Sequence, residues 1–257
     1  MAKIKVCSFN LRFENPGDGI NCFSNRLTRV LDVIREEKPD LIGFQEATDS
    51  MRKQLSDNLT EYTILGCGRG HDYRGESTAV AVLRERFELI SCDNFWLSPT
   101  PRVPGSRFSG VGQSGCPRVT TCVRVKPLDG ESSFRFCNTH LDHKGETARL
   151  LGIYEIMQYL SASDERFVLV GDLNAQPDSS VIAALGKAQP TGREIVEATR
   201  ALGGTFHNFG RMERNVKIDY IFTDGETDET DAYMVEKAPI DGVYVSDHHP
   251  IFATIEI

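Results

Sequence analysis

Acidic and amide side chains stand directly after apolar, strand-like runs in this sequence. The run VLVG at 168–171 is followed by Asp172 and Asn174, and the run IKVCSF at 4–9 is followed by Asn10. Residues two apart on a strand share a face, so Asp172 and Asn174 would project together from the end of their strand. Glycine, aspartate and asparagine are also the commonest turn residues, so a simple turn accounts equally well for this run alone.

The same arrangement recurs at five places, each an apolar run that ends on an acid, an amide or an imidazole. These ends carry Asn10, Gln45-Glu46, Asn138 and His140, Asp172 and Asn174, and Asp247-His248. In α/β proteins, ligand sites form outside the carboxyl ends of strands, so these polar ends predict one shared site. Carboxylate and amide oxygens suit Mg²⁺ or Mn²⁺ better than zinc.

Hydrophobic periodicity indicates which elements would position this site. Apolar residues at helical spacing occur at 27–34, 51–59 and 150–160, and a shorter helix is predicted after Asp178. About ten runs are strand-like by composition and alternation. They read IKVCSF, DLIGFQ, YTIL, TAVAVL, FELISC, RVTTCVRV, FRFCNTHL, RFVLVG, VKIDYIF and IFATIEI. This many strands would be wide for one open sheet, so a mixed α/β chain with two packed sheets and outer helices is expected.

Length, charge and cysteine content narrow the class of protein. The 257 residues contain no repeat, linker or low-complexity tract, so one domain spanning 1–257 is predicted. A net charge of −8 argues against a surface that coats nucleic acid. No signal peptide or membrane span is recognisable, and seven irregularly spaced cysteines without a CxxC pair indicate free thiols. We therefore expect a cytoplasmic protein in a reducing compartment, without a disulfide framework.

A long loop at 98–118 is the main basic segment. Asp93 and Asp129 bracket a stretch that contains no acid and five basic residues, which are Arg102, Arg107, Arg118, Arg124 and Lys126. Long loops in compact domains are usually functional or disordered. The stretch could meet an anionic substrate, or it could be a solvated flexible loop.

Six short motifs resemble the endonuclease/exonuclease/phosphatase superfamily, the DNase I-like group. The motifs SFN, FQE, NTHLDH, GDLN, KIDYIF and SDHHP occur in this order and span residues 6–252. The resemblance implies a four-layer α/β sandwich, in which two central, mostly antiparallel sheets are flanked by helices. NTHL and DYIF are most similar to the deadenylase and nocturnin branch, and FWLSPTPRVPGS is similar to small bacterial members.

The resemblance also implies a metal site and a catalytic pair. Glu46 would be the principal Mg²⁺ ligand, with Asn10 and Asp247 near the ion, and Mn²⁺ could substitute. His248 would pair with Asp219 of KIDYIF, whose carboxylate orients the imidazole and favours its charged form.

The remaining matched residues would position the attacking water and bind the phosphate. Asp172 and Asn174 would position the attacking water and a phosphate oxygen. His140 would bind the phosphate or assist the leaving group, and Glu76 would support this histidine. Arg118 would hold a phosphate oxygen.

Together these features predict a Mg²⁺-dependent phosphoesterase. The expected reaction is phosphodiester cleavage by in-line attack of a water activated by the His–Asp pair, with 3′→5′ RNA exonuclease activity as one form. A monomer is expected, with RNA or a nucleotide as substrate, no membrane contact and no obligate protein partner. Alternatives are a small-molecule phosphatase acting on a nucleotide, sugar phosphate or inositol phosphate, a lipid phosphodiesterase, and a catalytically inactive binding module.

Overall fold

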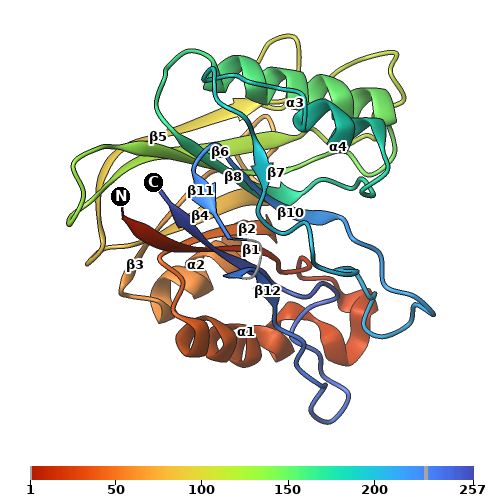
Figure 1. Cartoon of the computed structure of the whole chain (residues 1–257). Coiled ribbons are helices and arrows are strands. Elements are labelled where there is room, and N and C mark those ends of the chain that lie inside the picture. Colours follow the sequence, from red (N-terminus) through yellow and green to blue (C-terminus); the bar gives the residue numbers. More distant parts are fainter. Residues whose placement is uncertain (1, 229–230) are drawn as a thin grey trace.

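Two mixed β-sheets lie face to face in the computed structural model, which describes residues 2–228 and 231–257 (Figure 1). The first sheet contains β1 (Lys3–Asn10), β2 (Leu41–Ala47), β3 (Tyr62–Leu65), β4 (Ser77–Leu83), β11 (Glu226–Thr227), β12 (Tyr233–Met234) and β13 (Ile251–Glu256). The second contains β5 (Phe87–Trp96), β6 (Val119–Pro127), β7 (Phe134–His140), β8 (Phe167–Asp172), β9 (Val196–Glu197) and β10 (Asp219–Thr223). All ten predicted strands are present, and the additional ones are two residues long.

Helices cover the outer face of each sheet. Figure 1 shows α1 (Phe23–Glu37) and α2 (Asp49–Asn58) on one side, and α3 (Glu146–Leu160) and α4 (Ser180–Leu185) on the other. A short 3₁₀ helix, η1 (Pro16–Asn21), precedes α1. This arrangement confirms the expected four-layer sandwich of two mostly antiparallel sheets.

The strands β2, β4, β7, β8 and β10 are buried on both faces, which explains their nearly continuous apolar runs in the sequence. In β1, Ile4 and Val6 belong to the core between the sheets, whereas Cys7 and Phe9 face the core under α1 and α2. A third core lies between the second sheet and α3 with α4.

The polar strand ends lie together at one edge of the sandwich. The strand pairs β1–β2 and β7–β8 are parallel, so their carboxyl ends meet at this edge. β10 runs antiparallel to β8, and its first residue, Asp219, lies opposite Asp172. Glu76 and Arg118 reach the same edge because they immediately precede β4 and β6, which are antiparallel to β2 and β7. Topology alone therefore brings distant motifs together.

The cysteines differ from the sequence expectation at one pair. Cys122 and Cys137 lie opposite each other on β6 and β7 and form a disulfide, so the prediction that these two are free thiols is wrong. Cys7, Cys22, Cys67, Cys92 and Cys116 are free. Among the helices that the structure describes, none has the length and apolar character to cross a membrane.

Candidate active site

A cleft of about 550 Å³ opens at the polar edge of the sandwich. Eight of the ten predicted site residues line it: Glu46, Glu76, Arg118, His140, Asp172, Asn174, Asp247 and His248. The other two, Asn10 and Asp219, are buried beside it and bond to residues of the lining.

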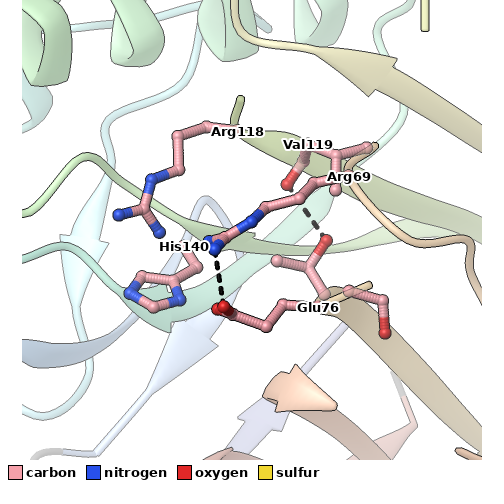
Figure 2. Close-up of a pocket in the computed structure, with 7 residues that line it drawn as sticks. Arg69, Glu76, Arg118, Val119 and His140 are labelled. Atoms are coloured by element: carbon pink, nitrogen blue, oxygen red, sulfur yellow. Dashed lines mark hydrogen bonds and ion pairs between the residues drawn. The ribbon is translucent and has the colours of Figure 1, made fainter. Parts of the chain in front are cut away.

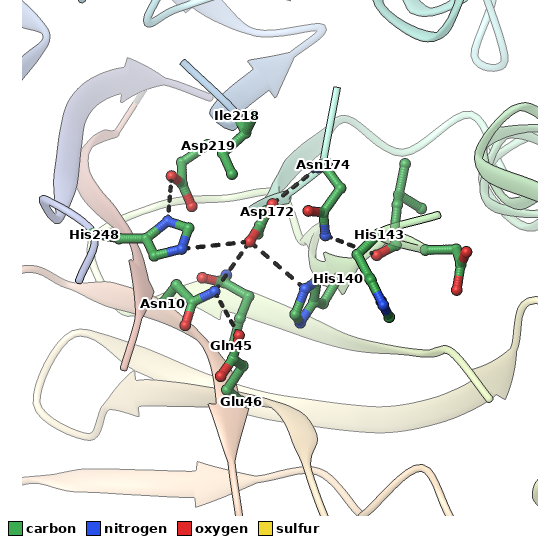
Figure 3. Close-up of polar contacts among 12 residues, drawn as sticks. Asn10, Gln45, Glu46, His140, His143, Asp172, Asn174, Ile218, Asp219 and His248 are labelled. Atoms are coloured by element: carbon green, nitrogen blue, oxygen red, sulfur yellow. Dashed lines mark hydrogen bonds and ion pairs between the residues drawn. The ribbon is translucent and has the colours of Figure 1, made fainter. Parts of the chain in front are cut away.

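His248 stands between two carboxylates (Figure 3). Its Nδ1 lies 2.8 Å from Asp219 Oδ2, and its Nε2 lies 3.9 Å from Asp172 Oδ2. Thr205 Oγ1 donates to the same Asp219 oxygen at 2.5 Å, which holds that carboxylate in place. Burial alone would lower the pKa of His248, but the charge and hydrogen bond of Asp219 outweigh it and raise the pKa to about 10. At neutral pH this imidazole is therefore a cation.

Asp172 is the centre of the polar network at the end of β8. Its Oδ1 accepts the N–H of Asn174 at 2.9 Å, and its Oδ2 accepts the side-chain amide of Asn10 at 3.0 Å. Burial and the charge of Asp219 raise the pKa of Asp172 to about 7, although His248 opposes the shift. A carboxylate with a pKa near neutrality is suited to accept a proton from a bound water.

A β-bulge turns Glu46 into the cleft. The pairing of β2 with β4 shifts register between Phe44 and Ala47, and Glu46 takes a φ of +61°. This left-handed conformation is unfavourable for a glutamate, and such backbone strain is concentrated at functional sites. The carboxylate accepts from Asn10 Nδ2 at 3.2 Å and from the Phe13 N–H at 3.0 Å.

Asn10, which was predicted to lie near the metal, stands beside Glu46, the predicted principal ligand. Its Nδ2 donates to Glu46 and Asp172, and its Oδ1 accepts the Arg12 N–H at 2.9 Å, which fixes the orientation of the amide. The amide therefore links the two carboxylates as a donor and does not present its oxygen to an ion between them.

Glu46 and Asp247 form a carboxylate pair that fits a divalent metal. Burial raises the pKa of Asp247, and the charge of Glu46 adds to this effect against the opposing charge of His248. Arg12 Nε lies 3.9 Å from Asp247 Oδ2 but is bonded to Asp18 at 2.8 Å. A hard cation would compensate the two carboxylates, whose oxygens are the ligands that Mg²⁺ prefers.

A second group could also hold a metal. Ligand atoms of Asp172, Asp219 and His248 all lie within 4.8 Å of one another. In this group the charged imidazole already compensates the carboxylates, so the arrangement fits a histidine–aspartate pair better than a metal site.

Two arginines flank His140 at one end of the cleft (Figure 2). Arg118 Nη2 lies 2.9 Å from His143 Nδ1, and Arg69 Nη2 donates to Glu76 Oε1 at 2.5 Å. Glu76 was expected to support His140, and the structure instead gives it Arg69 as its ion-pair partner. Burial, followed by the charges of Arg118 and Arg69, lowers the pKa of His140 well below its usual value, so this imidazole is neutral.

The loop at 98–118 contributes less positive charge to the cleft than expected. Of its five neighbouring basic residues, only Arg118 lines the cleft. Arg102 pairs with Asp93, and Arg124 pairs with Glu165. Two of the five basic residues are thus engaged in local ion pairs away from the cleft.

Sequence reasoning missed several lining residues and misplaced two polar strand ends. Arg12, Phe206 and Asn208 line the cleft, although only Arg12, two residues after Asn10, had a sequence signal nearby. Gln45 and Asn138 do not reach the cleft. They are fully buried and bond to each other between the sheets, with Gln45 Nε2 donating to Asn138 Oδ1 at 2.7 Å.

Known proteins share both the sequence pattern and the fold. The pattern that defines the Endonuclease/Exonuclease/phosphatase family matches residues 7–248. An endonuclease/exonuclease/phosphatase of Bacteroides vulgatus is 26% identical with a TM-score of 0.87, and the match covers 100% of both chains. A mannosyl-6-phosphatase of Bacteroides thetaiotaomicron is 25% identical with a TM-score of 0.81, covering 99% of this chain and 100% of that one.

The catalytic domain of human nocturnin shares the fold at lower identity. It is 18% identical with a TM-score of 0.73, and the match covers 99% of this chain and 94% of that one. At this identity the likeness concerns architecture alone.

Proposed function

The chain belongs to the endonuclease/exonuclease/phosphatase family of phosphoester-hydrolysing enzymes, and we propose that it cleaves its substrate with a Mg²⁺ bound at Glu46 and Asp247. Members of this family generally use a divalent metal. The observation that carries the proposal is the convergence of Asp172, the His248–Asp219 pair and Arg118 on one cleft that also contains this carboxylate pair. The core between the two sheets supports our further proposal that residues 1–257 act as one domain. We also propose that the chain acts as a monomer.

Mg²⁺, when bound, would neutralise charge on the phosphate and the departing oxygen. The protein side chains would then carry out proton transfer and position the attacking water. Asp172, with its pKa near neutrality, would accept the proton of the attacking water, and Asn174 would help to position that water. This assignment moves the base from the histidine–aspartate pair, where the motifs suggested it, to Asp172.

The cationic His248 and Arg118 would stabilise negative charge as it develops on phosphorus-bound oxygens. Asp219 keeps His248 protonated and oriented through the 2.8 Å contact. His140 is neutral and can donate one hydrogen bond to the phosphate or the leaving oxygen without adding charge.

Two substrate classes remain candidates. The motifs favour a phosphodiester, including a 3′→5′ RNA exonuclease reaction on RNA or a nucleotide. The resemblance to the mannosyl-6-phosphatase along nearly the whole chain supports the second class, a small phosphorylated molecule. The acidic net charge of −8 also favours a small substrate over a long polyanion.

A substrate panel tests the proposal. Purified protein is assayed with Mg²⁺, with Mn²⁺ and after EDTA treatment on poly(A) RNA, a dinucleotide, a sugar phosphate and bis(4-nitrophenyl) phosphate. We expect metal-dependent release of product from at least one ester. Absence of turnover on every ester, or full activity after EDTA treatment, would contradict the proposal.

A further inference from the structure

The end of the cleft beside His140 contains two guanidinium groups and a small cavity. We call this region the arginine corner and define it by Arg69, Glu76, Arg118 and His140, which together line a cavity of about 10 Å³ behind the main cleft (Figure 2). The volume is that of a single water site. The corner adjoins the reaction centre, because His140 Nε2 is only 3.6 Å from Asp172 Oδ2.

Arg118 is a buried cation with unused donors. It is 4% exposed, and its Nε and Nη1 have no hydrogen-bond partner among the residues that the structure describes. The nearest carboxylate oxygen, Asp142 Oδ2, is 3.6 Å from Nε and is engaged by Ser114 Oγ. Unpaired N–H groups on a buried guanidinium are unfavourable, so the site is built for an anionic acceptor.

Arg69 directs a second guanidinium at the same cavity and is held there by the loops around it. Its carbonyl accepts Trp96 Nε1 at 2.8 Å, its Nη2 donates to Glu76 at 2.5 Å, and the same nitrogen lies 3.4 Å from Cys116 Sγ. Glu76 is thus the ion-pair partner of Arg69, whereas Arg118 has only the more distant Asp142, at 3.6 Å. Burial and the charge of Arg69 lower the pKa of Arg118, against the opposing charges of Asp142 and Glu76.

Residues of β4 and β6 and the residue before β4 line the inner side of the corner. Ser77, Thr78 and Val119 form its inner wall and are each at most 3% exposed. Thr78 Oγ1 donates to the Val119 carbonyl at 3.0 Å, which ties β4 to β6 behind the arginines. A phosphate oxygen can enter this corner, but a second ester substituent cannot continue through it.

We propose that the arginine corner receives the terminal oxygens of a phosphomonoester, so that the enzyme prefers monoesters to diesters and Arg69 determines this preference. The inference rests on the proposed function and names its substrate class. A monoester is largely dianionic at neutral pH because its second pKa is about 6, and it carries three terminal oxygens, whereas a diester is a monoanion with two. The unused donors of Arg118 and the neighbouring Arg69 match the additional oxygen and charge, and a cavity of about 10 Å³ has no room for the additional substituent.

The test compares 4-nitrophenyl phosphate with bis(4-nitrophenyl) phosphate in Mg²⁺, using wild type, Arg69→Gln and Arg69→Lys. Arg74→Gln is the matched control, because Arg74 is an exposed arginine of the same loop and does not line the cleft. For wild type and for Arg74→Gln, we expect kcat/KM to be higher on the monoester than on the diester. Arg69→Gln should lower the monoester-to-diester ratio of kcat/KM by about 10- to 100-fold, as for the loss of a charge-assisted hydrogen bond, with partial rescue by lysine.

Binding gives a readout that does not depend on turnover. In calorimetry, inorganic phosphate should bind wild type more tightly than Arg69→Gln. Diethyl phosphate should bind the two proteins with the same affinity. A higher kcat/KM on the diester in wild type would overturn the inference. An equal fall of kcat/KM on both substrates in Arg69→Gln would do the same. Absence of turnover on both esters would instead contradict the proposed function, and phosphate binding would still decide whether the corner recognises the anion.

Discussion

Replacing Asp142 with asparagine should destabilise the protein at neutral pH and leave it nearly unchanged in acid. Asp142 is 2% exposed, and its Oδ1 accepts the backbone N–H groups of Ser114, Lys144 and Gly145 at 3.1, 3.0 and 2.8 Å. Its Oδ2 accepts the Ser114 hydroxyl and faces Arg118 Nε at 3.6 Å. One carboxylate thus fastens the end of the 98–118 loop to the turn after β7. Asparagine would keep the Oδ1 bonds but would place an N–H group toward Arg118.

The magnitude follows from the pKa of Asp142. Burial alone would raise it, but the hydrogen bonds from Gly145 and Ser114 outweigh burial and lower it from 3.8 to about 2. Since each pKa unit is worth about 1.4 kcal/mol, the ionised carboxylate contributes about 2 kcal/mol to the free energy of unfolding. The folded-state pKa is depressed, so this contribution is present above about pH 4 and is lost as the pH falls toward about 2. At pH 7 the corresponding fall in Tm is about 4–8 °C for a chain of this length.

Urea unfolding of wild type and Asp142→Asn between pH 7 and pH 2 measures this contribution directly. The difference in unfolding free energy should be about 2 kcal/mol at pH 7. It should disappear as the Asp142 carboxylate of the wild type becomes protonated. An unchanged difference across the whole range would show that the carboxylate charge is not what holds the loop. A difference below about 0.5 kcal/mol at pH 7, the size of an ordinary surface substitution, would show that the hydrogen bonds do not stabilise the fold.

Three further outcomes test the catalytic pair, the metal site and the disulfide. Asp172→Asn and His248→Asn should each lower kcat by about 10²–10⁴-fold without changing the far-ultraviolet circular dichroism spectrum, because each removes a group that acts on the proton or the developing charge. Glu46→Gln should raise the Mg²⁺ concentration for half-maximal activity by at least about tenfold, measured by metal titration. Reduction of the Cys122–Cys137 disulfide, which closes a sequence separation of 15, should cost about 3 kcal/mol of stability and lower the Tm in calorimetry.

Matched variants separate these effects from general damage. Glu61→Gln removes an exposed carboxylate outside the cleft and should leave the Mg²⁺ titration unchanged. The double variant Cys122→Ser with Cys137→Ser should have a Tm that no longer responds to reductant. If the metal titrations of Glu46→Gln and wild type coincide, Glu46 is not a ligand. If reductant leaves the Tm of wild type unchanged, the disulfide does not stabilise the protein.

The layered fold was predictable because central strands that are buried on both faces appear in the sequence as nearly continuous apolar runs. RFVLVG and FRFCNTHL appear as β8 and β7, since nearly every side chain in them packs against one core or another. The strands β9, β11 and β12 left no trace, because two residues cannot show a period. The Cys122–Cys137 pair depends on the register between β6 and β7, which cysteine spacing does not reveal.

The site was predictable to the extent that strand ends determine it. Asp172 and Asp219 meet because β8 and β10 are antiparallel neighbours in register. The sequence placed Asp172 at a strand end, whereas Asp219 lay within the predicted run VKIDYIF and was assigned through the family resemblance. The pairing of Arg69 with Glu76 depends instead on how the loop from 66 to 76 packs against Trp96 and Cys116. Such contacts between loops have no periodic signature in the sequence.

Backbone conformation at the cleft explains why local rules fail there. Arg12, Glu46, Asn174 and Asn208 all line the cleft and all have positive φ, between +47° and +61°, which is uncommon for residues other than glycine. The conformation is unfavourable for Arg12 and Glu46, whereas asparagine, as at positions 174 and 208, adopts it more readily. At Glu46 the conformation coincides with the bulge that aims the carboxylate away from regular strand geometry and toward Asn10. Local preference was therefore overridden at the positions where side chains must converge, and the hydrogen bonds around them supply the compensation.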